Sequence, residues 1–268
     1  MAIAILVNQK NAMPRIQAFE FEDFPWFPAL IRNYMTDFLQ FLANASDFFK
    51  PVVPVIEKAL AHSKTNTIVD LASGGGGGLV RLSKYLVASH PDLKIVLTDF
   101  YPNLDAFRHI TEKRPCFRYV EDPVNALAVP RDLAGLRTQF LSFHHFAPIQ
   151  ARQILQNAVD NGSPIGIFEA QERSLPSLLA MFVSPITVLI TTPFIRPFRV
   201  GRIIFTYLVP LVPLFIWWDG IVSALRTYSV DEMQALVDGV RGQETYAWEI
   251  KRVKSGPGVV LYLVGWKK

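Results

Sequence analysis

Short apolar runs alternate with segments of helical apolar spacing through the middle of the chain. The helical segments include residues 79–87 and 149–158, where apolar positions recur every three or four residues. The apolar runs that we interpret as strands are residues 67–71, 94–98, 117–122, 138–143 and 164–169. Strands that alternate with helices predict an α/β domain with a parallel sheet.

The last part of the chain has a different pattern. Residues 245–251 and 259–266 alternate apolar and polar positions, and the turn at 254–258 contains Gly-Pro-Gly. This pattern predicts an antiparallel hairpin at the end of the sheet. Before it, Ser229 and Glu232 have the spacing of a capping box, which predicts a helix that begins at Val230.

The N-terminal part reads as helical from 15 to 62, and we expect a helical cap over residues 1–62. Residues 174–195 form 22 uncharged positions, and 203–218 form 16 more, with three arginines between them. An uncharged run of about 18 residues is a candidate membrane span. Five prolines and the arginine-rich connection are unfavourable for two spans. Three interpretations stay open: a helical hairpin that enters one leaflet, two true spans, or a lid over an apolar pocket.

Composition narrows the classes of partner. The 268 residues are 50% hydrophobic, with a net charge of +4 and a pI near 9.2. No run of Lys and Arg is present, so we expect no nucleic acid partner, whereas the mild positive charge suits an anionic membrane surface. The single cysteine, Cys116, excludes an intrachain disulfide and a Cys-based zinc site. Residues 1–7 are apolar but short and lack a basic start, so we expect no cleaved signal peptide.

A glycine run follows the first predicted strand. Asp70 ends the strand, Gly74 to Gly78 are consecutive glycines, and a helix pattern begins at Leu79. A strand, a glycine-rich turn and a helix start are typical of a nucleotide-binding βα unit. A dinucleotide fingerprint would need a glycine at position 79, so that class fits less well. The alternative is a glycine-rich surface loop without a ligand.

This stretch resembles motif I of the class I S-adenosylmethionine-dependent methyltransferases. Asp70, Ala72, Gly74 and Gly76 take the places of the motif, and Ala72 departs from the usual glycine. The resemblance covers residues 15–174 and 217–268. It implies a Rossmann-like, seven-stranded, mostly parallel sheet that ends in an antiparallel hairpin, and S-adenosyl-L-methionine as the cofactor.

Several positions are then expected to bind the cofactor. Asp99 ends the second strand a little over twenty residues after the glycine run, the spacing of an acid that accepts hydrogen bonds from ribose hydroxyls. Asp99 could instead cap the next helix. By resemblance, Asp122 or Glu121 would reach the adenine amino group, although either could be a solvated loop acid. The full expected set is Asp70, Ala72, Ser73, Gly74, Gly75, Gly76, Asp99, Phe100, Glu121, Asp122 and Phe143.

The catalytic candidates are His144 and His145, which end the fourth predicted strand. An imidazole suits proton removal from a hydroxyl at neutral pH. Consecutive residues on an extended segment point to opposite sides, so we expect only one of them to face the ligand, and we favour His144 as the base. The alternative is that neither acts as a base. Adjacent histidines without a third ligand do not predict a metal site.

Three further residues are candidates for substrate binding. Arg173 could clamp a carboxylate, unless Glu169 and Glu172 merely neutralise it. Arg226 and Tyr228 lie in a W-D-G-x-x-S-x-L-R-x-Y run that is similar to runs in small-molecule methyltransferases, which implies a place at the substrate pocket. The alternative for Arg226 is a structural pair with Asp219.

The predicted organisation has three parts: the cap at 1–62, a cofactor-binding core at 63–173 and 217–268, and an apolar insertion at 174–216. The leading hypothesis is a methyltransferase that methylates an oxygen of a lipophilic small molecule, bound through 174–218 to the cytoplasmic side of a membrane. A soluble cytoplasmic location is the alternative. The competing functions are a nucleotide-dependent oxidoreductase and a non-catalytic, membrane-tethered protein of the same fold.

Overall fold

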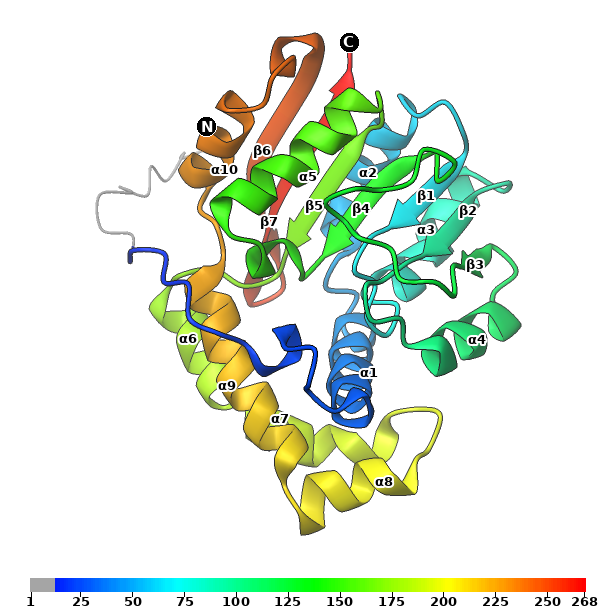
Figure 1. Cartoon of the computed structure of the whole chain (residues 1–268). Coiled ribbons are helices and arrows are strands. Elements are labelled where there is room, and N and C mark those ends of the chain that lie inside the picture. The colour runs from blue at the N-terminus through cyan, green and yellow to red at the C-terminus, as the bar shows by residue number, and fades with distance from the viewer. Residues whose placement is uncertain (1–12) are drawn as a thin grey trace, which may run out of the picture.

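The computed structural model describes residues 13–268, in which a seven-stranded sheet carries helices on both faces (Figure 1). The apolar start at 1–7 and the first part of the expected cap lie outside the described residues. The strand order is β3-β2-β1-β4-β5-β7-β6. The strands are β1 Thr67–Asp70, β2 Lys94–Leu97, β3 Phe117–Tyr119, β4 Leu136–Phe140, β5 Ile165–Glu169, β6 Tyr246–Ser255 and β7 Gly258–Lys267.

The first five strands are parallel, and the last two form a hairpin that joins β5 in antiparallel register. The α/β fold class and the terminal hairpin are therefore confirmed. The observed ends of β3 and β4 differ from the predicted ends and move candidate residues into loops. β3 ends at Tyr119, so Glu121 and Asp122 lie in the exposed loop after it, and β4 ends at Phe140 rather than at 143.

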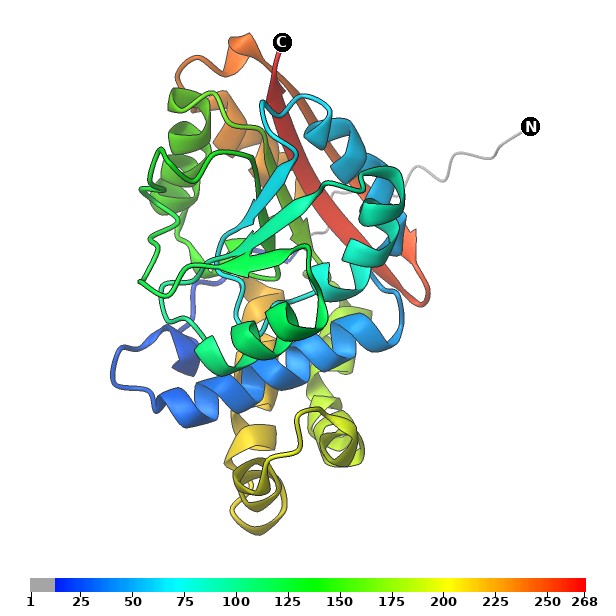
Figure 2. The ribbon, with the colours of Figure 1, turned by 90° about the vertical axis from the view of Figure 1, so that its right-hand side faces the viewer.

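Helices cover the sheet in two layers (Figures 1 and 2). One face packs on α5 (Pro148–Asp160) and α10 (Val230–Asp238), whose buried residues share a core with β1, β5 and β7. The other face packs on α2 (Val53–Leu60), α3 (Leu79–Ser89) and α4 (Leu104–Lys113). The capping box at the start of α10 is confirmed, since Ser229 Oγ accepts from the Glu232 backbone and Glu232 accepts from Ser229.

The carboxyl ends of the parallel strands face α1 (Ala29–Ala45), which runs across them (Figure 2). Its approach explains part of the glycine run. A Cβ at Gly75 would lie 3.0 Å from the Thr36 carbonyl oxygen, and one at Gly76, where φ is +100°, would lie 2.5 Å from Ile110 Cδ1. Larger residues at these positions would force α1 and α4 away from the sheet.

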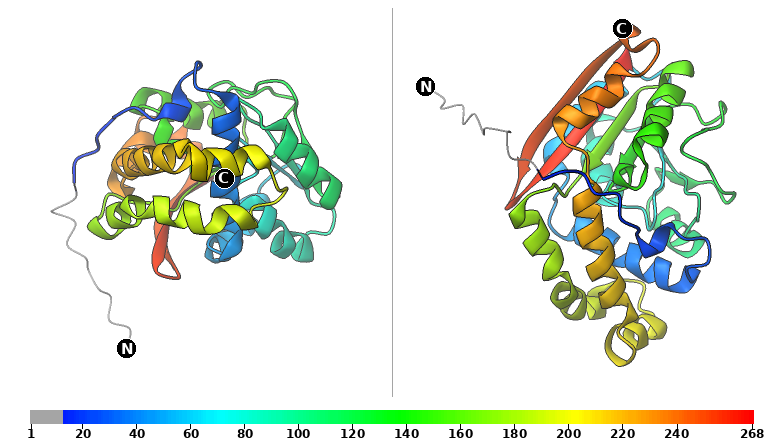
Figure 3. Two further views of the ribbon diagram at one scale, coloured as in Figure 1. Left: turned by 90° about the horizontal axis from the view of Figure 1, so that it is seen from below. Right: turned by 60° about the vertical axis from the view of Figure 1, so that its left-hand side comes forward.

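The expected helix over 15–62 is only partly present. Residues 13–28, which we call the strap, are irregular apart from a 3-10 turn at Phe21–Asp23. Pro25 and Pro28 disfavour helix in the residues that precede them. The strap crosses α9 (Leu211–Arg226), and the Ile16 N–H donates to the Leu225 carbonyl (Figure 3).

The apolar insertion is helical and projects from the carboxyl-end side of the sheet (Figures 1 and 3). We call residues 174–218 the arm. It contains α6 (Leu175–Phe182), α7 (Ser184–Thr191), α8 (Val200–Ile203), a π-helical turn at Ile204–Leu208, and the first half of α9. The expected boundary between 216 and 217 falls inside α9, so insertion and core share one continuous helix.

The helices of the arm are apolar but short. In residues 13–268 no single helix is both long and apolar enough to cross a membrane. Two pairs of consecutive helices are long and apolar enough only when each pair is counted as one segment. The pairs are Leu175–Phe182 with Ser184–Phe194, bent by 45°, and Val200–Leu208 with Leu211–Arg226, bent by 75°.

Two links fasten the arm to α1. Val188, Val212 and Ile216 share an apolar cluster with Ile31 and Phe38 of α1. The second link is the buried ion pair between Arg202 and Asp37, in which Arg202 also donates to the carbonyls of Ile195 and Pro197. The arm is thus an extension of the N-terminal cap as much as of the sheet.

Asp70 at the end of β1 is buried in the sheet, where its Oδ1 accepts a 2.6 Å hydrogen bond from the Thr138 hydroxyl. Burial raises the pKa of Asp70 to about 7. In the unfolded chain the same carboxyl ionises near its ordinary value of 3.8. Between these values the folded protein holds a proton that the unfolded chain has lost, so stability falls as pH rises through this window.

We therefore expect Asp70→Asn to remove this pH dependence. Asparagine stays neutral and can still accept from Thr138, so the gain in stability over the parent should be roughly 2 kcal/mol larger at about pH 8 than at about pH 5. Urea unfolding followed by far-ultraviolet circular dichroism measures it. A difference between parent and variant that is the same at both pH values would contradict the assignment.

Candidate functional site

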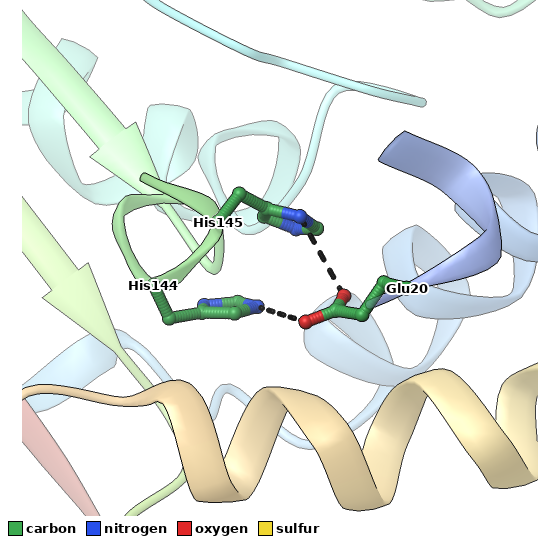
Figure 4. Close-up of side chains that lie close together, drawn as sticks. All are labelled: Glu20, His144 and His145. Atoms are coloured by element: carbon green, nitrogen blue, oxygen red, sulfur yellow. Dashed lines mark ion pairs between the residues drawn. The ribbon is translucent and has the colours of Figure 1, made fainter. Parts of the chain in front are cut away.

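The strongest cluster of chemical groups lies just beyond the carboxyl end of β4. After Phe140 the chain turns through a 3-10 helix, Phe143–His145, instead of continuing as a strand. The expectation that His144 and His145 point to opposite sides is wrong for this reason. Their rings lie 4.4 Å apart, centre to centre, and both point toward Glu20 (Figure 4).

His144 is oriented by a carboxylate from the next strand. Its Nδ1 lies 3.0 Å from Glu169 Oε2, and its backbone N–H donates to Glu169 Oε1 at 3.1 Å. A carboxylate only accepts hydrogen bonds, so the bond to Glu169 places the proton on Nδ1 and leaves Nε2 as the second ring position. The Gln171 amide nitrogen lies 3.0 Å from the same Nδ1 and donates to Glu169 Oε2 at 3.1 Å. Nε2 is buried with no hydrogen-bond partner in residues 13–268, and Glu20 Oε1 lies 3.8 Å away. An oriented imidazole with a free lone pair is the arrangement of a general base.

His145 has the opposite electrostatic environment. Its Nδ1 lies 2.7 Å from Asp23 Oδ1 and 3.5 Å from Glu20 Oε2, and its Nε2 lies 3.5 Å from Glu22. Burial alone would lower the pKa of His145, but the charge of Glu20 and the bond to Asp23 outweigh it and raise the pKa to about 10. His145 is therefore a cation at neutral pH and is unsuited to accept a proton.

The strap supplies the acids of this cluster. Glu20 is fully buried, and Arg226 Nη1 donates to Glu20 Oε1 at 3.0 Å and to Asp23 Oδ2 at 2.6 Å. Asp219 accepts from the backbone N–H groups of Phe21 and Glu22 at 2.8 and 3.3 Å. Arg226 thus pairs with the strap instead of with Asp219, and both residues of α9 hold the strap across the carboxyl end of the sheet.

Several carboxyl groups lie close together where the strap meets α9. Burial, followed by the neighbouring charge of Glu22, raises the pKa of Asp219 to about 8. For Asp23, burial would raise the pKa, but His145 and Arg226 together hold it well below its ordinary range. The site therefore combines fixed ion pairs with one imidazole, His144, whose Nε2 has no hydrogen-bond partner in residues 13–268.

Sequence reasoning missed Glu20 and Asp23, and it considered Glu169 only as a neighbour of Arg173. Glu20 and Asp23 belong to an acidic and aromatic run, Phe19 to Asp23, that has no helix or strand pattern. Glu169 ends β5 beside β4, so its position at the strand end was the available signal.

The same cluster could receive a metal ion. Glu20, His144 and His145 each offer one ligand atom, and these atoms lie within 4.8 Å of one another. A carboxylate with two imidazoles is a common divalent metal set. The third ligand that the sequence did not supply is thus present in the fold, although Arg226 and Asp23 already pair with Glu20 and His145.

Asp99 lies at the carboxyl end of β2, next to the glycine run. Its Oδ2 accepts from the Gly74 N–H at 2.7 Å and its Oδ1 accepts from the Tyr101 N–H at 2.8 Å. The helix cap is another residue, since Asn103 Oδ1 accepts from the Ala106 N–H at the start of α4. A carboxylate has about four acceptor positions, so Asp99 keeps capacity for a diol. Phe100 beside it is 51% exposed and offers an aromatic face.

The other cofactor candidates differ in conformation, contacts and exposure. Ala72 has a φ of +54°, which shows that the turn takes the left-handed conformation without a glycine there. Ser73 Oγ donates to the Asp70 carbonyl and accepts from the Thr98 N–H. Phe143 is fully buried against Tyr228. Glu121 and Asp122 are exposed.

Arg173 and Tyr228 also have protein partners. Arg173 Nη1 lies 2.8 Å from Glu232 Oε2 and donates to the Thr227 carbonyl. The Tyr228 hydroxyl donates to the Phe146 carbonyl at 2.7 Å, and Arg15 stacks on its ring. A carboxylate substrate would have to displace Glu232 to reach Arg173.

No protein-family model and no curated protein matches the chain. Among solved structures, the chain resembles an O-methyltransferase family protein from Burkholderia thailandensis, with 17% identity over 82% of this chain and 56% of that chain, at a TM-score of 0.46. It also resembles human N-acetylserotonin methyltransferase in complex with S-adenosylmethionine, with 12% identity over 87% and 55% and a TM-score of 0.49. A third similar structure, from Rhodobacter sphaeroides, is described as a Zn-dependent alcohol dehydrogenase. The identity is 13% over 87% of this chain and 98% of that chain, and the TM-score is 0.47.

The chain spans little more than half the length of the first two of these proteins. Likeness at this level is similarity of fold, and these chains include two classes of enzyme. The chemistry of the site has to be argued from the residues of this chain.

Proposed function

We propose that this protein is an S-adenosylmethionine-dependent methyltransferase that acts on an oxygen of a small lipophilic molecule. The observation that carries the proposal is His144, whose Nδ1 is held by Glu169 and whose buried Nε2 has no partner in residues 13–268. Further support comes from the strand order and from Asp99 beside a glycine run.

The residues of this chain would act on the acceptor. An acceptor hydroxyl that donates to His144 Nε2 would give this nitrogen a hydrogen-bond partner and lose its proton to it. Glu169 is then a positioning residue that stabilises the imidazolium through Nδ1. Glu20, 3.8 Å from Nε2, stabilises the same charge. The buried surroundings exclude water, which favours alignment of acceptor and methyl group.

Residues at and beside the glycine run would hold the cofactor. Asp99 would accept from the ribose hydroxyls, Phe100 would contact the adenine, and the backbone from Ala72 to Gly74 would line the methionyl end. The two unused acceptor positions on Asp99 and the exposed ring of Phe100 fit an adenosyl group. When bound, the cofactor supplies an electrophilic methyl group.

The lipophilic substrate and the membrane location are supported by the surface of the arm. The arm projects away from the sheet (Figures 1 and 3), and many of its large apolar side chains are exposed. They include Leu175, Leu179, Phe182, Ile186, Ile190, Phe194, Phe198, Leu208 and Leu214. Contiguous exposed apolar surface of this kind is characteristic of membrane or protein contact. We propose that the arm lies in the interface of the cytoplasmic leaflet, where Arg196 can reach headgroup phosphates.

We expect Asp99→Ala to weaken the binding of S-adenosylhomocysteine, measured by calorimetric titration, by roughly 10- to 100-fold, since a hydrogen bond to a charged group contributes about 1.5–3 kcal/mol. Asp92→Ala, which removes an exposed acid in the loop before β2, is the control. NADH should not bind to the parent. Unchanged affinity in Asp99→Ala would refute the cofactor placement, and binding of NADH alone would favour an oxidoreductase.

For His144→Gln we expect kcat for methyl transfer to fall by about 10²–10⁴, the usual effect of losing a general base, while affinity for S-adenosylhomocysteine stays unchanged. The assay follows transfer from labelled S-adenosylmethionine to a panel of apolar phenols and alcohols. His109→Gln on α4 is the matched control. Equal kcat values for His144→Gln and for the parent, with any acceptor that the parent methylates, would show that His144 is not the base.

The arm generates a separate prediction. The triple variant Phe182→Ser, Ile186→Ser and Ile190→Ser should lose most of its co-sedimentation with phosphatidylcholine–phosphatidylserine vesicles, because it removes exposed apolar area from one side of α6 and α7. Ile149→Ser, an equally exposed apolar residue on α5, should sediment like the parent. A parent that stays in the supernatant contradicts membrane docking. If the parent is a dimer and the triple variant a monomer, the arm covers a second copy instead.

A further inference from the structure

Arg137 is a buried arginine at the opposite end of β4 from His144. It is the second residue of the strand, and its side chain lies on the face covered by α5. Only 1% of the residue is exposed. His144 follows the carboxyl end of the same strand, so the two residues lie on opposite edges of the sheet.

The charge of Arg137 has no carboxylate partner. Nη1 donates to Asn157 Oδ1 at 2.7 Å, and Nε is buried without any hydrogen-bond partner. Within residues 13–268 no Asp or Glu oxygen comes within 4.0 Å of this guanidinium, whereas the buried Arg202 and Arg226 each have a carboxylate. Burial lowers the pKa of Arg137 to about 10, so it remains a cation at neutral pH. Burying an unpaired charge is costly.

The nearby helix end does not supply the missing partner. Arg137 approaches the last turn of α5, where carbonyl groups carry partial negative charge. Those carbonyls are already bonded: Asn157 O to Asn161, Ala158 O to Ser163 and Tyr246, and Val159 O to Gly162. The helix end therefore supplies partial negative charge but no hydrogen bond to Arg137 Nε.

A cavity of about 280 Å³ opens beside Arg137. Two more cations, Lys64 and Arg131, line it, together with the hydroxyls of Ser63 and Ser163. The one acid in the lining, Asp160, accepts a 2.7 Å hydrogen bond from Gln156. The volume is near the lower end of small-molecule sites, which begin at about 300 Å³.

We propose that this cavity binds a phosphate group, either as free phosphate or as the monoester of a small molecule. A phosphate oxygen would satisfy Arg137 and place its charge against three cations, an arrangement that guanidinium groups bind with matched geometry. The site is independent of methyl transfer, because it lies at the amino ends of the strands and shares no residue with the His144 cluster.

Thermal unfolding with inorganic phosphate tests the site, at ionic strength held constant with sodium chloride. The melting temperature of the parent should rise with phosphate concentration, since a ligand that binds only the folded state stabilises it by RT ln(1 + [L]/Kd). Arg137→Met should show no such rise. In chloride alone it should be at least as stable as the parent, because an apolar side chain replaces an unpaired buried charge.

Arg152→Met is the control, since it removes an exposed arginine of α5 and should keep the full phosphate response. Ribose 5-phosphate in place of phosphate separates the two sources: a larger shift identifies a phosphorylated small molecule, and a smaller one identifies free phosphate. If Arg137→Met does not fold, the rim variant Lys64→Gln/Arg131→Gln should show a weakened response. An equal rise in the parent and in the variant, or no rise in the parent, overturns the proposal.

Discussion

The buried ion pair between Arg202 and Asp37 holds together parts of the protein that are far apart in sequence. Asp37 lies on α1, Arg202 lies in the arm, and Asn103 at the cap of α4 reaches both Thr36 and Asp37. Thr36 in turn packs on Gly74 and Gly75, and the Gly74 N–H donates to Asp99. The position of the arm, the closeness of α1 and the conformation of the glycine run therefore depend on one pair of charges whose loss would leave a buried carboxylate unpaired.

Two adjacent histidines have different chemistry because different acids reach them. Glu169 holds His144 through one nitrogen and leaves the other free, whereas strap acids surround His145 on both nitrogens. The strap therefore does two things: it makes His145 a cation at neutral pH, and it leaves His144 Nε2 without a hydrogen-bond partner in residues 13–268. This separation of roles within a dipeptide requires residues from three distant segments, the strap, β5 and α9.

The sheet was predictable because the spacing of apolar residues and the positions of turn residues can be read from short stretches of sequence. Alternating runs placed the strands, and the hairpin at 254–258 placed the antiparallel end. The glycine run and Asp99 were also found, since their spacing is visible in one dimension. The acids of the strap were not, because Glu20 has no local pattern and acquires its role only when α9 brings Arg226 against it. Arg137 precedes the predicted strand 138–143 and was not singled out, because whether a charge is paired is decided by the fold.

The continuity of α9 has a mechanical consequence. The helix runs from Leu211 in the arm to Arg226 in the polar cluster, and its 16 residues extend about 24 Å as a rigid rod. Val212 and Ile216 pack on α1 near one end, while Asp219 and Arg226 hold the strap near the other. Any tilt that a surface imposes on the arm is therefore carried without slack to the groups that surround His144. The position of the arm and the geometry of the His144 cluster are therefore coupled through one helix.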